Sequence, residues 1–104
     1  MPVTDPAGLT ADEVIRELGL VPHPEEGGWF VETYRCAETL AEGALAPRYG
    51  GARNCGTAIY YLLTPDTFSA LHRLESDEVF HFYLGDPVEM LQLAPVMGDG
   101  RFVT

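Results

Sequence analysis

Residues 68–85 read FSALHRLESDEVFHFYLG, and this stretch decides which fold the sequence predicts. It contains two runs rich in apolar and aromatic residues, 68–74 and 78–84, with the polar residues 75–77 between them. Runs of this length with such a turn are typical of a β-hairpin. We therefore expect two neighbouring antiparallel strands here.

The alternation of side chains along a strand predicts a polar pair inside this hairpin. If His72 faces inward and Glu78 does the same on the next strand, an imidazole and a carboxylate meet between the walls formed by Phe80 and Phe82. Such a pair binds a divalent metal, or acts as a histidine base that Glu78 orients. The alternatives are a core histidine bonded to a backbone carbonyl and a glutamate in solvent.

The opposite face of the hairpin is also largely apolar, with Leu71, Val79 and Tyr83. A sheet with two apolar faces is covered on both sides. We expect one side to face the interior of a barrel and the other to form a dimer interface. His81 has the opposite parity to Glu78 and is therefore assigned to that interface.

Further strands are predicted on both sides of this hairpin by alternating or β-branched runs between Gly, Pro and Asp turns. They cover residues 29–35, 57–63, 88–93 and 101–104. Residues 37–56 are rich in Ala and Gly and are expected to form a loop. Short strands at such spacing favour an all-β sandwich or barrel in a single domain, residues 1–104, with strands over 28–104.

One short helix is expected near the N-terminus, within residues 9–19. Thr10 followed by Glu13 is a capping-box pattern, and Gly19 is a typical residue just after a helix end. Next, residues 23–30 read HPEEGGWF, which is interpreted as the rim of a pocket or as a simple entry turn into strand 29–35.

The charge of the chain excludes several kinds of partner. Its 104 residues include 16 acidic and 6 basic ones, with a net charge of −10. Nucleic acids and anionic membranes attract clustered cations, so neither is an expected partner. The sequence has no signal-peptide pattern and no apolar run of membrane-spanning length. Cys36 and Cys55 are not spaced like a zinc knuckle or a redox pair, so reduced thiols in a cytoplasmic protein are expected.

The spacing His72-x-Leu74-x3-Glu78-x6-Gly85 resembles the first cupin motif, with Leu74 in place of its second histidine. Two long segments are similar to the cupin superfamily 5 group, the DUF985 family. They are residues 18–35, which read LGLVPHPEEGGWFVETYR, and residues 57–93. The resemblance runs from about Ala11 to the end of the chain.

This resemblance implies a cupin-type jelly roll, or the N-terminal portion of one, related in fold to sugar-nucleotide epimerases. It implies a small-molecule-binding protein with isomerase or epimerase activity on a polar, sugar-like ligand. The alternatives are a non-catalytic dimeric binding or storage-type module and a metal-dependent cupin oxygenase. Members of the group pair as homodimers by sheet exchange. The final strand therefore pairs with another subunit, or the natural sequence continues.

The candidate catalytic residues are His72 and Glu78. The candidate ligand-binding residues lie on the predicted strands: Glu32, Tyr34, Tyr60, Phe80 and Phe82. Glu32 and Tyr34 are expected to share one face of their strand, which lines a pocket or is a solvated edge face. Two ligands are too few for a tight metal site. No metal cofactor is therefore firmly predicted; a divalent metal, if one binds, takes His72 and Glu78.

Overall fold

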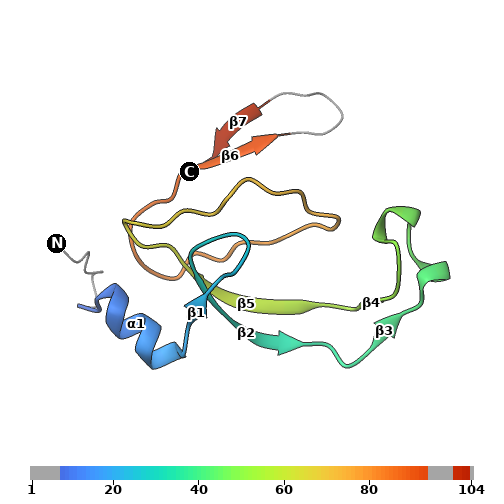
Figure 1. Cartoon of the computed structure of the whole chain (residues 1–104), viewed down its shortest axis with the longest axis horizontal. Helices are drawn as coiled ribbons and strands as arrows, with labels where there is room; N and C mark the ends of the chain where they lie inside the picture. Colours follow the sequence, from blue (N-terminus) through green and yellow to red (C-terminus); the bar gives the residue numbers. More distant parts are fainter. Residues whose placement is uncertain (1–7, 94–99, 104) are drawn as a thin grey trace.

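The structure is a computed structural model that describes residues 8–93 and 100–103 (Figure 1). Its one α-helix in that part, α1 (Ala11–Leu18), has the predicted ends. The Thr10 hydroxyl accepts a hydrogen bond from the backbone N–H of Glu13 at 3.2 Å, and Gly19 closes the helix in the left-handed conformation with φ 67°. Both caps satisfy backbone groups that the helix itself leaves unpaired. None of the described helices is long and apolar enough to cross a membrane.

A three-stranded antiparallel sheet forms the centre of the molecule, in the order β1-β2-β5. The strands are β1 (Val21–Pro22), β2 (Trp29–Arg35) and β5 (Thr57–Leu62). β2 is where the alternating pattern predicts it, and β5 ends one residue early. Both strands are rich in aromatic and β-branched residues, which suit a pleated surface. The predicted all-β class with one short helix is confirmed.

Two small hairpins form separate two-stranded sheets, one beyond the end of β2 and β5, and one on the other side of the segment that follows β5 (Figure 1). The predicted loop 37–56 contains two short paired strands and two 3-10 turns: β3 (Thr39–Leu40), β4 (Arg53–Asn54), η1 (Glu42–Ala44) and η2 (Pro47–Tyr49). Near the C-terminus, β6 (Met90–Leu93) pairs with β7 (Gly100–Val103). These two strands fall within or near the predicted ranges 88–93 and 101–104.

The prediction of strands over 68–74 and 78–84 is wrong for the chain as the structure shows it. The segment between β5 and β6, yellow to orange in Figure 1, runs out and back without a strand ladder. Its far end contacts η2, because Arg48 Nε donates to the Glu75 carbonyl at 2.9 Å and Tyr49 Oη lies 2.6 Å from Ser76 Oγ. A strand needs hydrogen bonds from a neighbouring strand, and alternation alone does not supply that neighbour.

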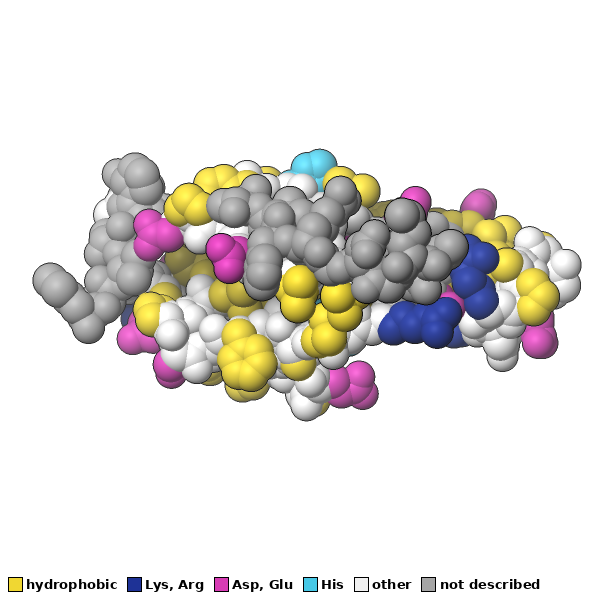
Figure 2. Space-filling model, turned by 90° about the horizontal axis from the view of Figure 1, so that it is seen from above, with side chains coloured by type: hydrophobic (Ala, Val, Ile, Leu, Met, Phe, Trp, Pro, Cys, Tyr) yellow, Lys and Arg dark blue, Asp and Glu magenta, His cyan; other side chains and the backbone are white. Residues whose placement is uncertain are grey.

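The described residues do not close a barrel, and the chain is open in shape. Its radius of gyration is 16.2 Å, whereas a compact domain of this length has about 13 Å. Among described hydrophobic residues, only Val14 and Leu20 are buried. Figure 2 accordingly shows hydrophobic side chains exposed over much of one face. Most apolar side chains of the described residues are therefore not packed into a core.

Candidate functional site

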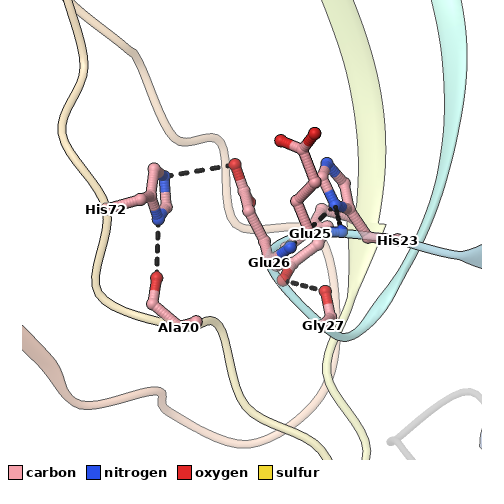
Figure 3. A network of polar contacts seen from close by, with 7 residues as sticks. His23, Glu25, Glu26, Gly27, Ala70 and His72 are labelled. Atoms are coloured by element: carbon pink, nitrogen blue, oxygen red, sulfur yellow. Dashed lines mark hydrogen bonds and ion pairs between the residues drawn. The ribbon is translucent and has the colours of Figure 1, made fainter.

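The turn between β1 and β2 is held by His23 (Figure 3). Its Nδ1 accepts hydrogen bonds from the backbone N–H groups of Glu25 at 3.2 Å and Glu26 at 3.0 Å. The ring also lies against Phe30, with 4.7 Å between ring centroids. Because Nδ1 accepts, the hydrogen of the neutral ring is on Nε2. His23 thus fixes the backbone that carries Glu26.

Gly27 and Gly28 let this turn approach the chain after β5 very closely. Their φ angles are 88° and 72°, in the left-handed region that favours glycine. A Cβ atom at Gly27 would lie 2.5 Å from the Phe68 carbonyl oxygen, and one at Gly28 would lie 2.8 Å from Tyr61 Oη. A 2.7 Å hydrogen bond from the Ala70 N–H to the Glu26 carbonyl oxygen holds the turn and the chain after β5 together. The two glycines therefore bring residues 68–72 beside Glu26.

His72 is held in this place through both ring nitrogens (Figure 3). Nδ1 lies 2.6 Å from the Ala70 carbonyl oxygen, and Nε2 lies 3.2 Å from Glu26 Oε1. The two side chains are 33% and 27% exposed. A carbonyl oxygen only accepts, so Nδ1 carries a hydrogen. The Glu26 carboxylate therefore lies where it accepts a hydrogen bond from Nε2 when Nε2 is protonated.

A cavity of about 350 Å³, open to solvent, is lined by Glu26 of this pair but not by His72. It is lined by both glycines of the turn, by three carboxylate side chains and by residues of the following segment: Glu25, Glu26, Gly27, Gly28, Asp66, Thr67, Phe68 and Ala70. Its volume falls in the range of small-molecule sites, about 300–1,000 Å³. Carboxylates accept hydrogen bonds from hydroxyl groups, and the Phe68 ring offers an apolar face.

The structure does not bring Glu78 to His72. No hydrogen bond or ion pair joins these two side chains in residues 8–93, and Glu78 is exposed. Phe80 and Phe82 are 63% and 69% exposed, so they do not enclose the His72 ring. The carboxylate beside the imidazole is that of Glu26. The roles assigned to Glu78, Phe80 and Phe82 stay predictions, and so does the catalytic role of His72.

The three other predicted ligand-binding residues lie on the central sheet. A β-bulge between Glu32 and Tyr34 places them opposite Ile59 and Ala58, which are consecutive residues of β5. Cross-strand partners share a face, so Glu32 and Tyr34 lie on opposite faces. The expectation that they share one is wrong, because the bulge adds a residue to β2.

Glu32 forms an ion pair with Arg35, with 2.7 Å between Oε1 and Nη2. Tyr60 makes an edge-to-face contact with Tyr83, with 5.9 Å between ring centroids. This contact brings residue 83 beside β5, although the two segments do not pair as strands. A ligand-binding role for Glu32, Tyr34 and Tyr60 stays a prediction.

A second polar cluster lies where β2 leads into β3. The Cys36 and Cys55 sulfurs and a Glu38 carboxylate oxygen all lie within 4.8 Å of one another. Both cysteines are free thiols, with Cys36 partly buried and Cys55 exposed. A backbone hydrogen bond from Glu38, and next one from the Tyr34 side chain, lower the pKa of Cys36. Burial, and next the charge of Cys36, raise the pKa of Cys55.

These opposite shifts predict a difference in thiol reactivity. Only the thiolate attacks an alkylating agent. As pH rises, Cys36 loses its proton first, so it should be alkylated by iodoacetamide at lower pH than Cys55. Peptide mass spectrometry of briefly labelled protein over a pH series measures both rates. Equal midpoints for the two cysteines would contradict the assignment, and Tyr34→Phe should move the Cys36 midpoint upward.

Sequence reasoning missed both Glu26 and the pairing of the cysteines. Glu26 lies in the segment interpreted as a pocket rim or an entry turn, and in the structure this segment is the turn before β2 and also lines the cavity. For the cysteines a signal was present, since Cys36 and Cys55 flank the loop that strands 29–35 and 57–63 would close as a hairpin. Residues at the two ends of such a loop face each other across the strand pair.

Antiparallel sheets with one short capped helix are consistent with a small cupin-like β fold. The sequence matches the family model described as Cupin superfamily (DUF985) over residues 12–103. The chain belongs to this family, as the resemblance of its motifs implied. No curated protein and no solved structure matches it significantly.

Proposed function

We propose that this cupin binds an uncharged, hydroxyl-bearing small molecule of the sugar type in the cavity beside His72, and that it acts as an isomerase or epimerase. The observation that carries the proposal is the His72–Glu26 contact of 3.2 Å at the edge of that cavity. Three carboxylates around the cavity favour hydroxyl groups and disfavour phosphates. Phe68 supplies a face for the carbon skeleton of a sugar.

The proposed base is the neutral His72 ring with its hydrogen on Nδ1 and a free lone pair on Nε2. When Nε2 takes a proton from the ligand, the ring becomes an imidazolium that the Glu26 carboxylate stabilises. A carbon next to a carbonyl group can give a proton to such a base and receive one back, which inverts or shifts the centre. The Ala70 carbonyl holds the Nδ1 hydrogen, so Nε2 is the nitrogen that exchanges protons.

Proton exchange with solvent tests this proposal directly. Six-carbon aldoses and ketoses are incubated with the protein in D2O, and deuterium at the carbon next to the carbonyl is followed by NMR. The protein should accelerate this exchange, and His72→Ala should lower the rate about 10²–10⁴-fold, as expected for loss of a general base. Glu26→Gln should lower it as well.

Two variants serve as controls for this experiment. His81→Ala removes an imidazole that stacks at 6.5 Å between ring centroids with Tyr83 and should leave the rate unchanged. Glu78→Gln tests the original pairing, because a loss equal to that of Glu26→Gln would assign the partner role to Glu78. Exchange that is unchanged in His72→Ala, or absent in the wild type with every sugar, would overturn the proposal.

The residues around His72 do not fit the metal that cupins often hold. Among the described residues, His72 Nε2 and Glu26 offer two ligand atoms here, and Leu74 occupies the second histidine position. Glu78 is not within hydrogen-bonding contact of His72. Tight sites need three or four converging ligands. The proposed chemistry at His72 therefore uses no metal ion.

A second proposal is that the protein is a homodimer in which residues 68–84 of each chain pair with the other chain, in the cytoplasm. The observation that favours it is the exposed surface of 8369 Å², against about 5,800 Å² for a compact chain of this mass. The excess of about 2,600 Å² per chain, or about 5,200 Å² for two chains, is at the upper end of the roughly 2,000–5,000 Å² that obligate homodimer interfaces bury in total. Phe68, Val79 and Phe82 lie in the exposed segment. The same dimer is expected if the protein is a non-catalytic binding module.

A further inference from the structure

The junction between the two strand pairs contains a bulge that gathers three metal-binding groups. Arg35 pairs with Thr57 in β2 and β5, and Thr39 pairs with Asn54 in β3 and β4. Between them, the Cys36 N–H donates to the Gly56 carbonyl at 2.8 Å, and the Cys55 N–H donates to the Glu38 carbonyl at 3.0 Å.

Ala37 is therefore an extra residue with no partner on the opposite strand. A bulge of this kind bends the strand and re-aims the side chains beside it. Here the side chains that come together are the two thiols and the Glu38 carboxylate, with donor atoms within 4.8 Å of one another. In the described residues no other set of histidine, cysteine or acidic side chains is gathered in this way.

We propose that Cys36, Glu38 and Cys55 form a binding site for one divalent cation of the zinc type, separate from the His72 cavity. Zinc takes thiolate and carboxylate ligands in a tetrahedron, with Zn–S of about 2.3 Å and Zn–O of about 2.0–2.2 Å. Sulfur atoms in such a tetrahedron are about 3.8 Å apart. The three donor atoms thus need to move by only about 1 Å to enclose the ion.

The chemistry of the three donors selects the class of cation. Thiolates favour zinc, cadmium and cobalt over magnesium and calcium, which take oxygen ligands. Three protein ligands leave a fourth position for water or another ligand. Cys55 is exposed and Cys36 is partly buried, so an ion can reach the site from solvent. As well as the Glu38 backbone, the Tyr34 side chain acts on the Cys36 thiol and lowers its pKa, and neighbours of this kind tune metal ligands.

Cadmium and cobalt report thiolate coordination through charge-transfer absorption, and each is titrated alone into the reduced full-length protein. We expect the absorption to saturate at one ion per chain, a stoichiometry that native mass spectrometry checks. Loss of a residue that only orients a metal ligand already lowers metal affinity by about 10–100-fold. Cys36→Ser and Cys55→Ser should therefore each weaken binding by more than about 100-fold, and Glu38→Gln by about 10-fold.

Two matched variants separate this site from other acidic or imidazole groups. Glu42→Gln removes a nearby exposed carboxylate of η1, and His72→Ala removes the imidazole of the other site. Both should leave the titration unchanged. A missing charge-transfer band, or saturation at one ion per two chains, would overturn the proposal. So would full affinity in Glu38→Gln, which would exclude the carboxylate as a ligand.

Discussion

Gly27→Ala is expected to lower the free energy of unfolding by about 3 kcal/mol. Two effects add at this position. The left-handed φ of 88° is costly for alanine, and the new Cβ meets the Phe68 carbonyl oxygen at 2.5 Å. That oxygen belongs to the backbone, so the two segments must separate. The Ala70–Glu26 hydrogen bond and the His72–Glu26 contact should weaken with them.

Gly50→Ala is the matched control, because Gly50 also has a positive φ, 65°, but has open space around its Cβ position. Its free energy of unfolding should fall only by the conformational cost of a left-handed alanine, about 1–2 kcal/mol. Urea denaturation of both variants measures the difference, and the NMR signals of the His72 ring report whether Glu26 has moved. Equal losses for the two variants, with an unchanged His72 ring, would show that the turn does not press against residue 68.

Elements that depend on nearby residues could be predicted from the sequence. The helix has its ends at Thr10 and Gly19 because both caps act within one turn of the chain. Strand 29–35 follows from its own alternation and from the glycines before it. In each case the residues that determine the structure lie next to the residues that adopt it.

The candidate site depends on contacts that local patterns do not contain. Alternation predicted strands on both sides of residues 75–77, but strands also need neighbours for their hydrogen bonds. The spacing of His72 and Glu78 suggested a pair, whereas the glycine turn brings Glu26 to the imidazole from a distant part of the chain. The bulges beside Glu32 and at Ala37 change which side chains share a face, and neither has a distinct signature in the sequence.

The protein is expected to elute as a dimer of about 23 kDa, twice the 11.4 kDa of one chain. Replacing Phe80 and Phe82 together by aspartate should convert it to monomers. Each phenylalanine buried at the interface contributes about 1.5–3 kcal/mol, and the dimer contains each twice. The loss of about 6 kcal/mol or more weakens association by on the order of 10⁴-fold.

Size-exclusion chromatography with light scattering measures this change over a dilution series. Leu40→Asp is the matched control, because Leu40 is an exposed apolar residue of β3, outside residues 68–84. It should remain dimeric. Val79→Asp, at a position 76% exposed in the single chain, gives a milder test if the double variant does not fold. A wild-type monomer at micromolar concentration, or a dimer that survives all the changes in 68–84, would contradict the proposed pairing.

Hydrogen exchange then shows where the partner lies. In a single chain the backbone of residues 78–84 has no strand ladder, so its amides should exchange fast. In the proposed dimer these amides gain hydrogen bonds from the other chain, and their exchange should slow by orders of magnitude together with that of residues 68–74. The double aspartate variant should lose this protection and keep that of β2 and β5. Protection that is equal in monomer and dimer would place the interface elsewhere on the molecule.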